Sequence, residues 1–132
     1  MIFGLGTDIV QIERIRKIHE RHGERFVEHL LLPEELAAFR AQQRNARFLA
    51  MRFAAKEAIV KAMGTGFAQG MWIRDTGTVA NAWGRPEIIW SERGREMCDR
   101  LGIGEGHITL SDEAGLVMAV AVLMRKSTGG ND

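Results

Sequence analysis

One segment, residues 47–63, constrains the fold more than any other part of this 132-residue chain. It contains no proline or glycine, and it ends at the glycine-rich stretch of residues 64–66. Drawn as a helix, its second half carries neutral side chains in almost every direction. A helix that is apolar nearly all the way round belongs in the interior of a protein. The segment therefore predicts a long central helix.

The predicted strands come mainly from the two ends of the chain. Residues 2–10 are apolar and β-branched, and residues 116–124 form a continuous apolar run, typical of a strand buried in the middle of a sheet. The alternation in residues 107–111 predicts another strand. Residues 71–90 predict a hairpin or meander that turns at residues 83–86, and the acidic pair at residues 112–113 is expected to form the last turn.

Shorter helices are expected from residue 12 to about residue 23, from 33 to about 42, and from 91 to 101. Gly23 and Gly102 are suited to ending helices, whereas Pro33 and Ser91 are suited to starting them. Strands and helices mix without strict alternation, which favours an α+β fold with a small antiparallel sheet packed against the long helix. We expect a single domain over residues 1–126 and a flexible tail over residues 127–132.

Composition excludes several classes of protein. The chain has 18 Lys and Arg residues against 17 Asp and Glu residues, which gives no reason to expect a nucleic-acid partner. Cys98 is the only cysteine, so neither an internal disulfide nor a cysteine-rich zinc site can form. The longest apolar run is too short for a membrane span, and the N-terminus does not resemble a signal peptide. We expect a cytoplasmic protein with no membrane contact.

Charged residues interrupt the apolar helix at Arg52, Lys56, Glu57 and Lys61. Glu57 and Lys61 are four residues apart and share a helix face, where small alanines leave room for a ligand. A carboxylate beside an ammonium group suits a metal-bound phosphate, because the acid can hold Mg²⁺ while the base neutralises phosphate oxygens. The simpler alternative is an ordinary ion pair on a helix.

Asp8 is the only charged residue in the first predicted strand. Carboxylates from two separate elements, such as Asp8 and Glu57, form a typical Mg²⁺ site, in which water and substrate phosphate complete the coordination. Alternatively, Asp8 accepts hydrogen bonds in a turn or caps the helix that begins near Ile12.

Two motifs together resemble a known family. The sequences GLGTDIVQIERI at residues 4–15 and RFAAKEAIVKAMGTG at residues 52–66 are similar to those of the holo-[acyl-carrier-protein] synthases, the short 4′-phosphopantetheinyl transferases. The Gly-Arg-Pro turn at residues 84–86 and the strand that begins at His107 lie where the family has matching features, and the likeness extends from Ile2 to about Leu123. It implies transfer of 4′-phosphopantetheine from coenzyme A to a serine of an acyl carrier protein, with release of adenosine 3′,5′-bisphosphate.

The resemblance also implies roles for individual residues. Asp8 and Glu57 would hold Mg²⁺ and would act in catalysis together with Lys61. The coenzyme A site would be formed by Arg52, Lys61, Gly64, Thr65, Gly66, Pro86, His107 and Thr109. Arg14 and Arg21 would bind the acidic carrier protein. Short members of the family assemble as homotrimers, with each active site between neighbouring subunits.

Two positions depart from the family pattern. Asp112 stands where a second histidine is common, and Gln11 stands where Glu is more usual. We therefore expect no mechanism that depends on that second imidazole, and the general base is left unassigned. The residues are also compatible with a Mg²⁺-dependent nucleotide or coenzyme A pyrophosphohydrolase, or with a non-catalytic coenzyme A or carrier-binding module. Packing in a hairpin or interface is the simplest role for Trp72, Trp83 and Trp90.

Overall fold

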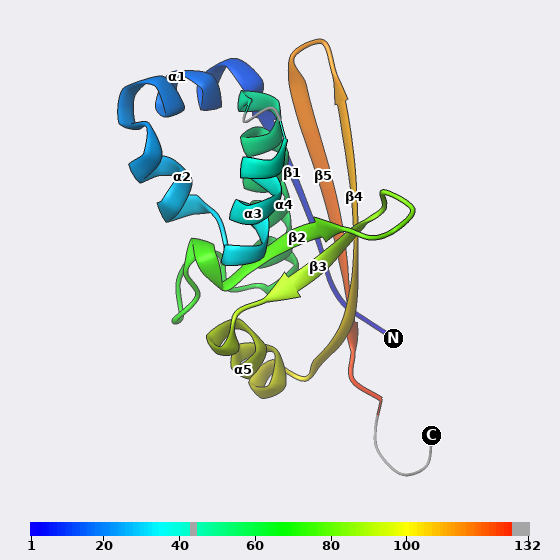
Figure 1. Ribbon diagram of the computed structural model, residues 1–132. Coiled ribbons are helices and arrows are strands. Elements are labelled where there is room, and N and C mark those ends of the chain that lie inside the picture. The colour runs from blue at the N-terminus through cyan, green and yellow to red at the C-terminus, as the bar shows by residue number, and fades with distance from the viewer. Residues whose placement is uncertain (43–44, 128–132) are drawn as a thin grey trace.

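Helix α4, Ala46–Met63, runs through the middle of the molecule (Figure 1). This arrangement comes from a computed structural model, which describes residues 1–42 and 45–127. Asn45 caps the start of α4 by accepting a 2.9 Å hydrogen bond from the Phe48 backbone N–H, and Gly64 ends it in the left-handed conformation. Most α4 side chains are buried, as the sequence predicted for a central helix.

A three-stranded antiparallel sheet packs against α4. Its strands are β1 (Ile2–Gln11), β4 (Ile103–Glu113) and β5 (Leu116–Arg125), and β5 lies between the other two. The central position of β5 confirms the prediction drawn from its unbroken apolar run. Every second residue of β5, from Val117 to Leu123, is fully buried beneath the helix.

Strand β1 approaches α4 so closely that only glycine fits at the contact. A Cβ atom added at Gly6 would lie 2.7 Å from the Ala62 backbone nitrogen and closer still to the Ala58 carbonyl oxygen. Gly4 makes the same kind of approach to the Ala62 backbone. Side chains alternate along a strand, so Asp8 continues this face and lies over the helix.

Three helices lie on the side of α4 away from the sheet, as Figure 1 shows. They are α1 (Ile12–His22), α2 (Glu24–Leu30) and α3 (Pro33–Ala41). The sequence predicted α1 and α3 but not α2, which restarts helical structure directly after the positive-φ residue Gly23. Within the described residues, no helix combines the length and the apolar character needed to cross a bilayer.

A separate hairpin and the fifth helix complete the fold. The 3₁₀ turn η1 (Ile73–Asp75) leads into strands β2 (Thr76–Ala80) and β3 (Pro86–Trp90), which form the predicted hairpin. Helix α5 (Glu92–Leu101) begins at the predicted Ser91 cap, whose side chain accepts a hydrogen bond from the Gly94 N–H, and ends at Gly102.

The predicted acidic turn at residues 112–113 is wrong. Asp112 and Glu113 belong to β4 and pair with β5, and the turn is formed by Ala114 and Gly115. Both turn residues have positive φ, 55° and 79°, which is the geometry that matches the twist of two antiparallel strands. Of the predicted flexible tail, residues 128–132 lie outside the described residues.

The face of the sheet that points away from α4 is apolar and uncovered in the single chain. Leu5 and Ile9 of β1 retain 63% and 61% of their accessible surface, and Met118 of the central strand retains 45%. Val120, Val122 and Met124 continue the same face of β5. One side of the sheet therefore forms the core with α4, while the other side presents an apolar surface.

Candidate active site

The structure brings Asp8 of β1 together with Lys61 of α4, although they are far apart in the sequence. The Lys61 ammonium group donates hydrogen bonds to the Asp8 carboxylate at 3.1 Å and to the Thr7 carbonyl at 3.0 Å. Glu57 lies one helical turn before Lys61 on the same face of α4. We call these three residues the Asp8–Glu57–Lys61 cluster. The alternative that Asp8 caps α1 is wrong, because no side chain caps that helix.

The two carboxylates of the cluster interact electrostatically. Burial and the negative charge of Asp8 raise the pKa of Glu57 above its ordinary value of 4.5, and Lys61 and Arg14 oppose the rise. An unfavourable carboxylate pair of this kind is relieved by a cation. Mg²⁺ commonly takes one or two protein carboxylates and fills its other positions with water and phosphate oxygens, so the donor set fits that metal.

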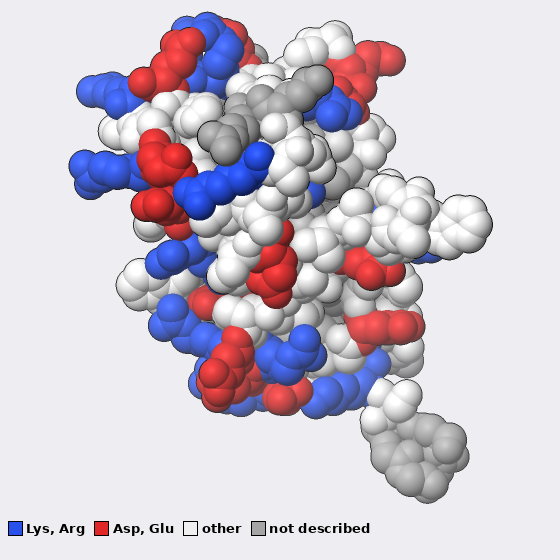
Figure 2. All heavy atoms as spheres, viewed as in Figure 1, with Lys and Arg blue, Asp and Glu red and all other residues white. Residues whose placement is uncertain are grey.

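Two arginines predicted to bind a carrier protein lie on α1, and the first of them, Arg14, lies beside the cluster. Arg14 lies 5.7 Å from the centre of the Phe53 ring of α4 and influences Glu57, so this end of α1 adjoins the Glu57 carboxylate. Within residues 1–42 and 45–127, neither Arg14 nor Arg21 forms an ion pair, whereas Arg16 pairs with Glu13 and Glu20. Basic and acidic side chains alternate over this part of the surface (Figure 2).

Gly64, Thr65 and Gly66 follow the cluster at the C-terminal end of α4. The backbone N–H groups of Gly64 and Gly66 donate to the carbonyls of Lys61 and Val60, at 3.0 and 3.1 Å, and thereby close the helix. Gly64 and Thr65 also line a cavity of about 390 Å³ together with Gln69 and Arg100. The segment therefore acts as a helix cap and leaves space beside the backbone.

Pro86 and His107 meet in a second cavity, of about 470 Å³, between the β2–β3 hairpin and β4. Arg85, Trp90 and Arg95 line the same cavity. From the sequence, Trp90 was expected only to pack in a hairpin or interface, and neither arginine was predicted as a site residue. Arg85 belongs to the Gly-Arg-Pro motif, so that motif could have identified it as a candidate site residue. Glu87 and Glu105 also line the cavity, so its two guanidinium groups stand beside two carboxylates and an apolar wall. The guanidinium groups can hold phosphate and the wall can hold a flat ring.

Arg52 and Thr109 lie outside these two cavities. Arg52 stacks on the Phe48 ring at 4.0 Å, and its Nε atom lies 3.8 Å from a Glu35 carboxylate oxygen. Thr109 is exposed on the uncovered face of the sheet, where it pairs with Val120 of β5. A single chain thus distributes the predicted site residues over several separate places.

Asp112, which departs from the resembled family's histidine, has a partner of its own. Its two carboxylate oxygens accept hydrogen bonds from Arg47 Nε and Nη2 at 2.8 and 2.9 Å. The guanidinium group of Arg47 lowers the pKa of Asp112, so this residue remains an anion rather than a proton donor or acceptor near neutral pH. The pair ties the first turn of α4 to the end of β4.

A sequence model described as "4'-phosphopantetheinyl transferase superfamily" matches residues 4–121. A protein from Halorhodospira halophila named holo-[acyl-carrier-protein] synthase is 44% identical, over 94% of this chain and 98% of its own length. The crystal structure of holo-[acyl-carrier-protein] synthase from Neisseria meningitidis superimposes with a TM-score of 0.89 and 37% identity, covering 95% of this chain and 100% of that one.

A second solved structure carries a ligand. Holo-[acyl-carrier-protein] synthase from Helicobacter pylori, in complex with coenzyme A, superimposes with a TM-score of 0.79 and 30% identity, covering 90% of this chain and 98% of that one.

Proposed function

This chain belongs to the 4′-phosphopantetheinyl transferase superfamily, and we propose that it transfers 4′-phosphopantetheine from coenzyme A to a serine of an acyl carrier protein. Membership confirms the resemblance inferred from the two sequence motifs. The observation that carries the proposal is the Asp8–Glu57–Lys61 cluster, in which a strand and a helix from distant parts of the chain place two carboxylates and an ammonium group together.

The chemistry of the cluster matches displacement at a pyrophosphate. The serine oxygen forms a bond to the phosphorus on the pantetheine side, and the bond from that phosphorus to the bridging oxygen breaks. Adenosine 3′,5′-bisphosphate leaves with the electron pair, and the serine proton passes to the solvent. Lys61 would stabilise negative charge on the phosphate oxygens, while Asp8 and Glu57 would hold Mg²⁺. Bound there, Mg²⁺ would supply further charge neutralisation of the pyrophosphate.

The two cavities are the proposed contacts for coenzyme A. For the nucleotide end, the cavity at Pro86 and His107 offers an apolar wall and the guanidinium groups of Arg85 and Arg95, with Glu87 and Glu105 also in its lining. Gly64, Thr65 and Gly66 leave open space next to the backbone at the end of α4. The complex of the Helicobacter pylori relative with coenzyme A supports this assignment of the ligand. Arg52 and Thr109 remain predicted contacts.

Helix α1 is the proposed docking site for the carrier protein. Arg14 and Arg21 are free to meet acidic side chains, because neither forms an ion pair within the described part of the chain. Arg14 also adjoins Glu57, so a carrier bound to α1 would present its serine close to the cluster. Such contacts act chiefly on encounter and orientation and are weakened by salt.

We further propose that the active form is a cytoplasmic homotrimer with sites between subunits. The uncovered sheet face supplies an apolar surface around Leu5, Ile9 and Met118 for subunit contact. Association would also bring residues that one chain keeps apart, such as Thr109 on that face and the cluster beside α4, toward a shared cleft.

Product analysis tests the proposed function. The protein is incubated with coenzyme A, Mg²⁺ and an apo acyl carrier protein, and the carrier is weighed by mass spectrometry. A gain of one phosphopantetheine, with stoichiometric adenosine 3′,5′-bisphosphate, is expected. Coenzyme A cleavage without any carrier would identify a pyrophosphohydrolase instead. Tight coenzyme A binding with no product would identify a binding module.

A further inference from the structure

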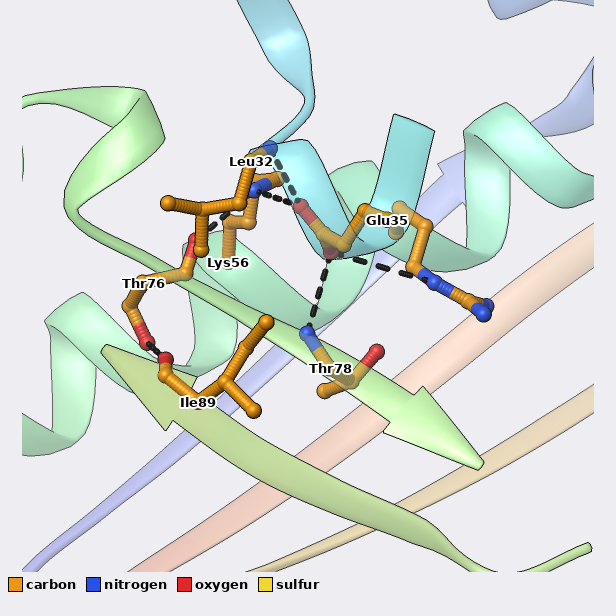
Figure 3. A network of polar contacts seen from close by, with 7 residues as sticks. Leu32, Glu35, Lys56, Thr76, Thr78 and Ile89 are labelled. Atoms are coloured by element: carbon orange, nitrogen blue, oxygen red, sulfur yellow. Dashed lines mark hydrogen bonds and ion pairs between the residues drawn. The ribbon is translucent and has the colours of Figure 1, made fainter. Parts of the chain in front are cut away.

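A charged pair is completely buried between α3, α4 and β2, away from the Asp8–Glu57–Lys61 cluster. Glu35 of α3 and Lys56 of α4 both have no accessible surface, and their charged atoms lie 2.6 Å apart (Figure 3). The other Glu35 oxygen accepts a 3.0 Å hydrogen bond from the Thr78 N–H, and Lys56 also donates to the Thr76 carbonyl at 2.7 Å. The network therefore joins three elements through one carboxylate and one ammonium group.

Glycine at position 77 makes this network possible. A Cβ atom added at Gly77 would lie 2.6 Å from one Glu35 carboxylate oxygen and closer still to the other. The β2 backbone thus leaves a gap that the carboxylate fills. The Leu32 N–H adds another hydrogen bond to Glu35, at 3.0 Å, so the position of the carboxylate is fixed from several directions.

Stability alone is a poor explanation for the Glu35–Lys56 pair. Removing two charges from water costs about as much as their attraction returns, and apolar residues of similar size often serve equally well. An ion pair with hydrogen bonds adds a preferred orientation of the two side chains. Apolar contacts constrain rotation weakly, and the buried surface of α4 is made largely of small alanines such as Ala54, Ala55 and Ala58.

We propose that the Glu35–Lys56 pair is a positioning device that fixes the rotation of α4 about its own axis and thereby sets how Glu57 and Lys61 meet Asp8. Lys56 and Glu57 are consecutive, so their side chains point about 100° apart on the helix, and fixing one fixes the other. A rotation of about 20° would move a group some 5 Å from the helix axis by nearly 2 Å. A misplacement of about 1 Å in a catalytic site can cost a hundredfold in rate.

The inference rests on the proposed function. Its test distinguishes a change in the rotation of α4 from a general loss of protein stability. The first variant is the double substitution Glu35→Gln/Lys56→Met, which removes both charges of the pair together. Arg52, whose Nε lies 3.8 Å from the Glu35 carboxylate, loses that weaker ion pair but keeps its stacking on Phe48. The second is Gly77→Ala, which displaces the carboxylate without removing any charge. The control is Val27→Ala in α2, which removes buried apolar volume without touching the pair. Thermal unfolding ranks the stability of all three.

Two further readouts are taken well below each unfolding temperature: binding of Mn²⁺, a probe for the metal site, by electron paramagnetic resonance, and transfer to the carrier with Mg²⁺. We expect both test variants to weaken Mn²⁺ binding and to lower kcat by tenfold or more. The KM for carrier should stay within about twofold, because α1 is unchanged. The Val27→Ala variant should be less stable but should match the wild type in both readouts.

Wild-type Mn²⁺ binding and kcat in the test variants would overturn the positioning role, as would equal losses in Val27→Ala. If the wild type binds Mn²⁺ but transfers nothing, the proposed function alone is refuted. The Mn²⁺ affinities of the two test variants, compared with that of the wild type, would then still test the positioning role of the Glu35–Lys56 pair. A wild type that does neither would overturn both.

Discussion

Substitution of Gly6 by alanine probes the contact that carries Asp8 to the cluster. The added Cβ atom would lie 2.7 Å from the Ala62 backbone nitrogen, and ordinary contact begins at about 3.4 Å. Strand and helix must therefore separate by at least about 0.7 Å, and by more at the Ala58 carbonyl oxygen. Both partners are backbone atoms in regular structure, so no side-chain rotation can relieve the clash.

The energetic cost follows from this geometry. Forcing an extra methyl group into a closely packed contact costs about 1–3 kcal/mol, and the gain from replacing a flexible glycine offsets less than about 1 kcal/mol of it. We expect a net loss of about 1–2 kcal/mol in the free energy of unfolding. Since Asp8 lies two residues further along the same strand, a shift near 1 Å should also reduce kcat/KM about a hundredfold.

Urea unfolding and carrier modification measured on the same preparation test this expectation. Gly104→Ala is the control for stability, because the tightest contact of its added Cβ would be with the Lys126 Cα at 3.2 Å, and the other two lie at an ordinary 3.5 Å. We expect a loss below about 0.5 kcal/mol there. Wild-type stability and activity for Gly6→Ala would refute the view that backbone contact between β1 and α4 positions Asp8.

The remaining predictions concern charge. Arg14→Gln should raise the KM for carrier several-fold at low salt, whereas the matched variant Arg16→Gln should not, because Arg16 is already paired within α1. Metal affinity should increase as pH rises from 4.5 through the raised pKa of Glu57, because the metal binds the ionised carboxylate. Without metal, the same ionisation should lower the free energy of unfolding of the wild type but not of Glu57→Gln, as unfolding curves from pH 4 to 8 would show. Asp112→Asn, which weakens an exposed ion pair with Arg47, should leave transfer rates and the Tm close to wild type.

Local sequence signals predicted much of the fold. The apolar run at 116–124 identified the central strand β5, and the apolar helix with its glycine stop identified α4. Ser91 and Gly102 marked both ends of α5. Each of these signals is a short-range effect of burial, capping or backbone freedom, so one sequence is enough to read it.

The predictions that failed concern a turn and a short helix, both of which depend on contacts between distant parts of the chain. The acidic residues 112–113 looked like a turn, but the positive-φ pair Ala114 and Gly115 reverses the chain and leaves Asp112 in the strand. Helix α2 was missed because it is only seven residues long and follows a helix-ending glycine. Tertiary packing determines such turns and short helices, so the pattern of neighbouring residues does not predict them.

In the candidate site too, the sequence predicted what local patterns show and missed what depends on distant contacts. Asp8 and Glu57 were predicted as partners because each is a charge inside an apolar element, and the structure places them close enough to influence each other. Lys56 was equally visible in the sequence, yet its partner Glu35 lies 21 residues away on another helix. Nothing in the sequence near Glu35 distinguishes it from the exposed Glu34 beside it.

Glu57→Gln tests the central claim most directly, because it removes one charge from the cluster and almost no volume. Carrier mass is followed with coenzyme A over a range of Mg²⁺ concentrations, and circular dichroism checks that the variant is folded. We expect a folded protein that binds Mg²⁺ weakly and adds phosphopantetheine to the carrier at least a thousandfold more slowly than wild type, a loss of about 4 kcal/mol in transition-state stabilisation. Wild-type transfer with an unchanged Mg²⁺ requirement would contradict it.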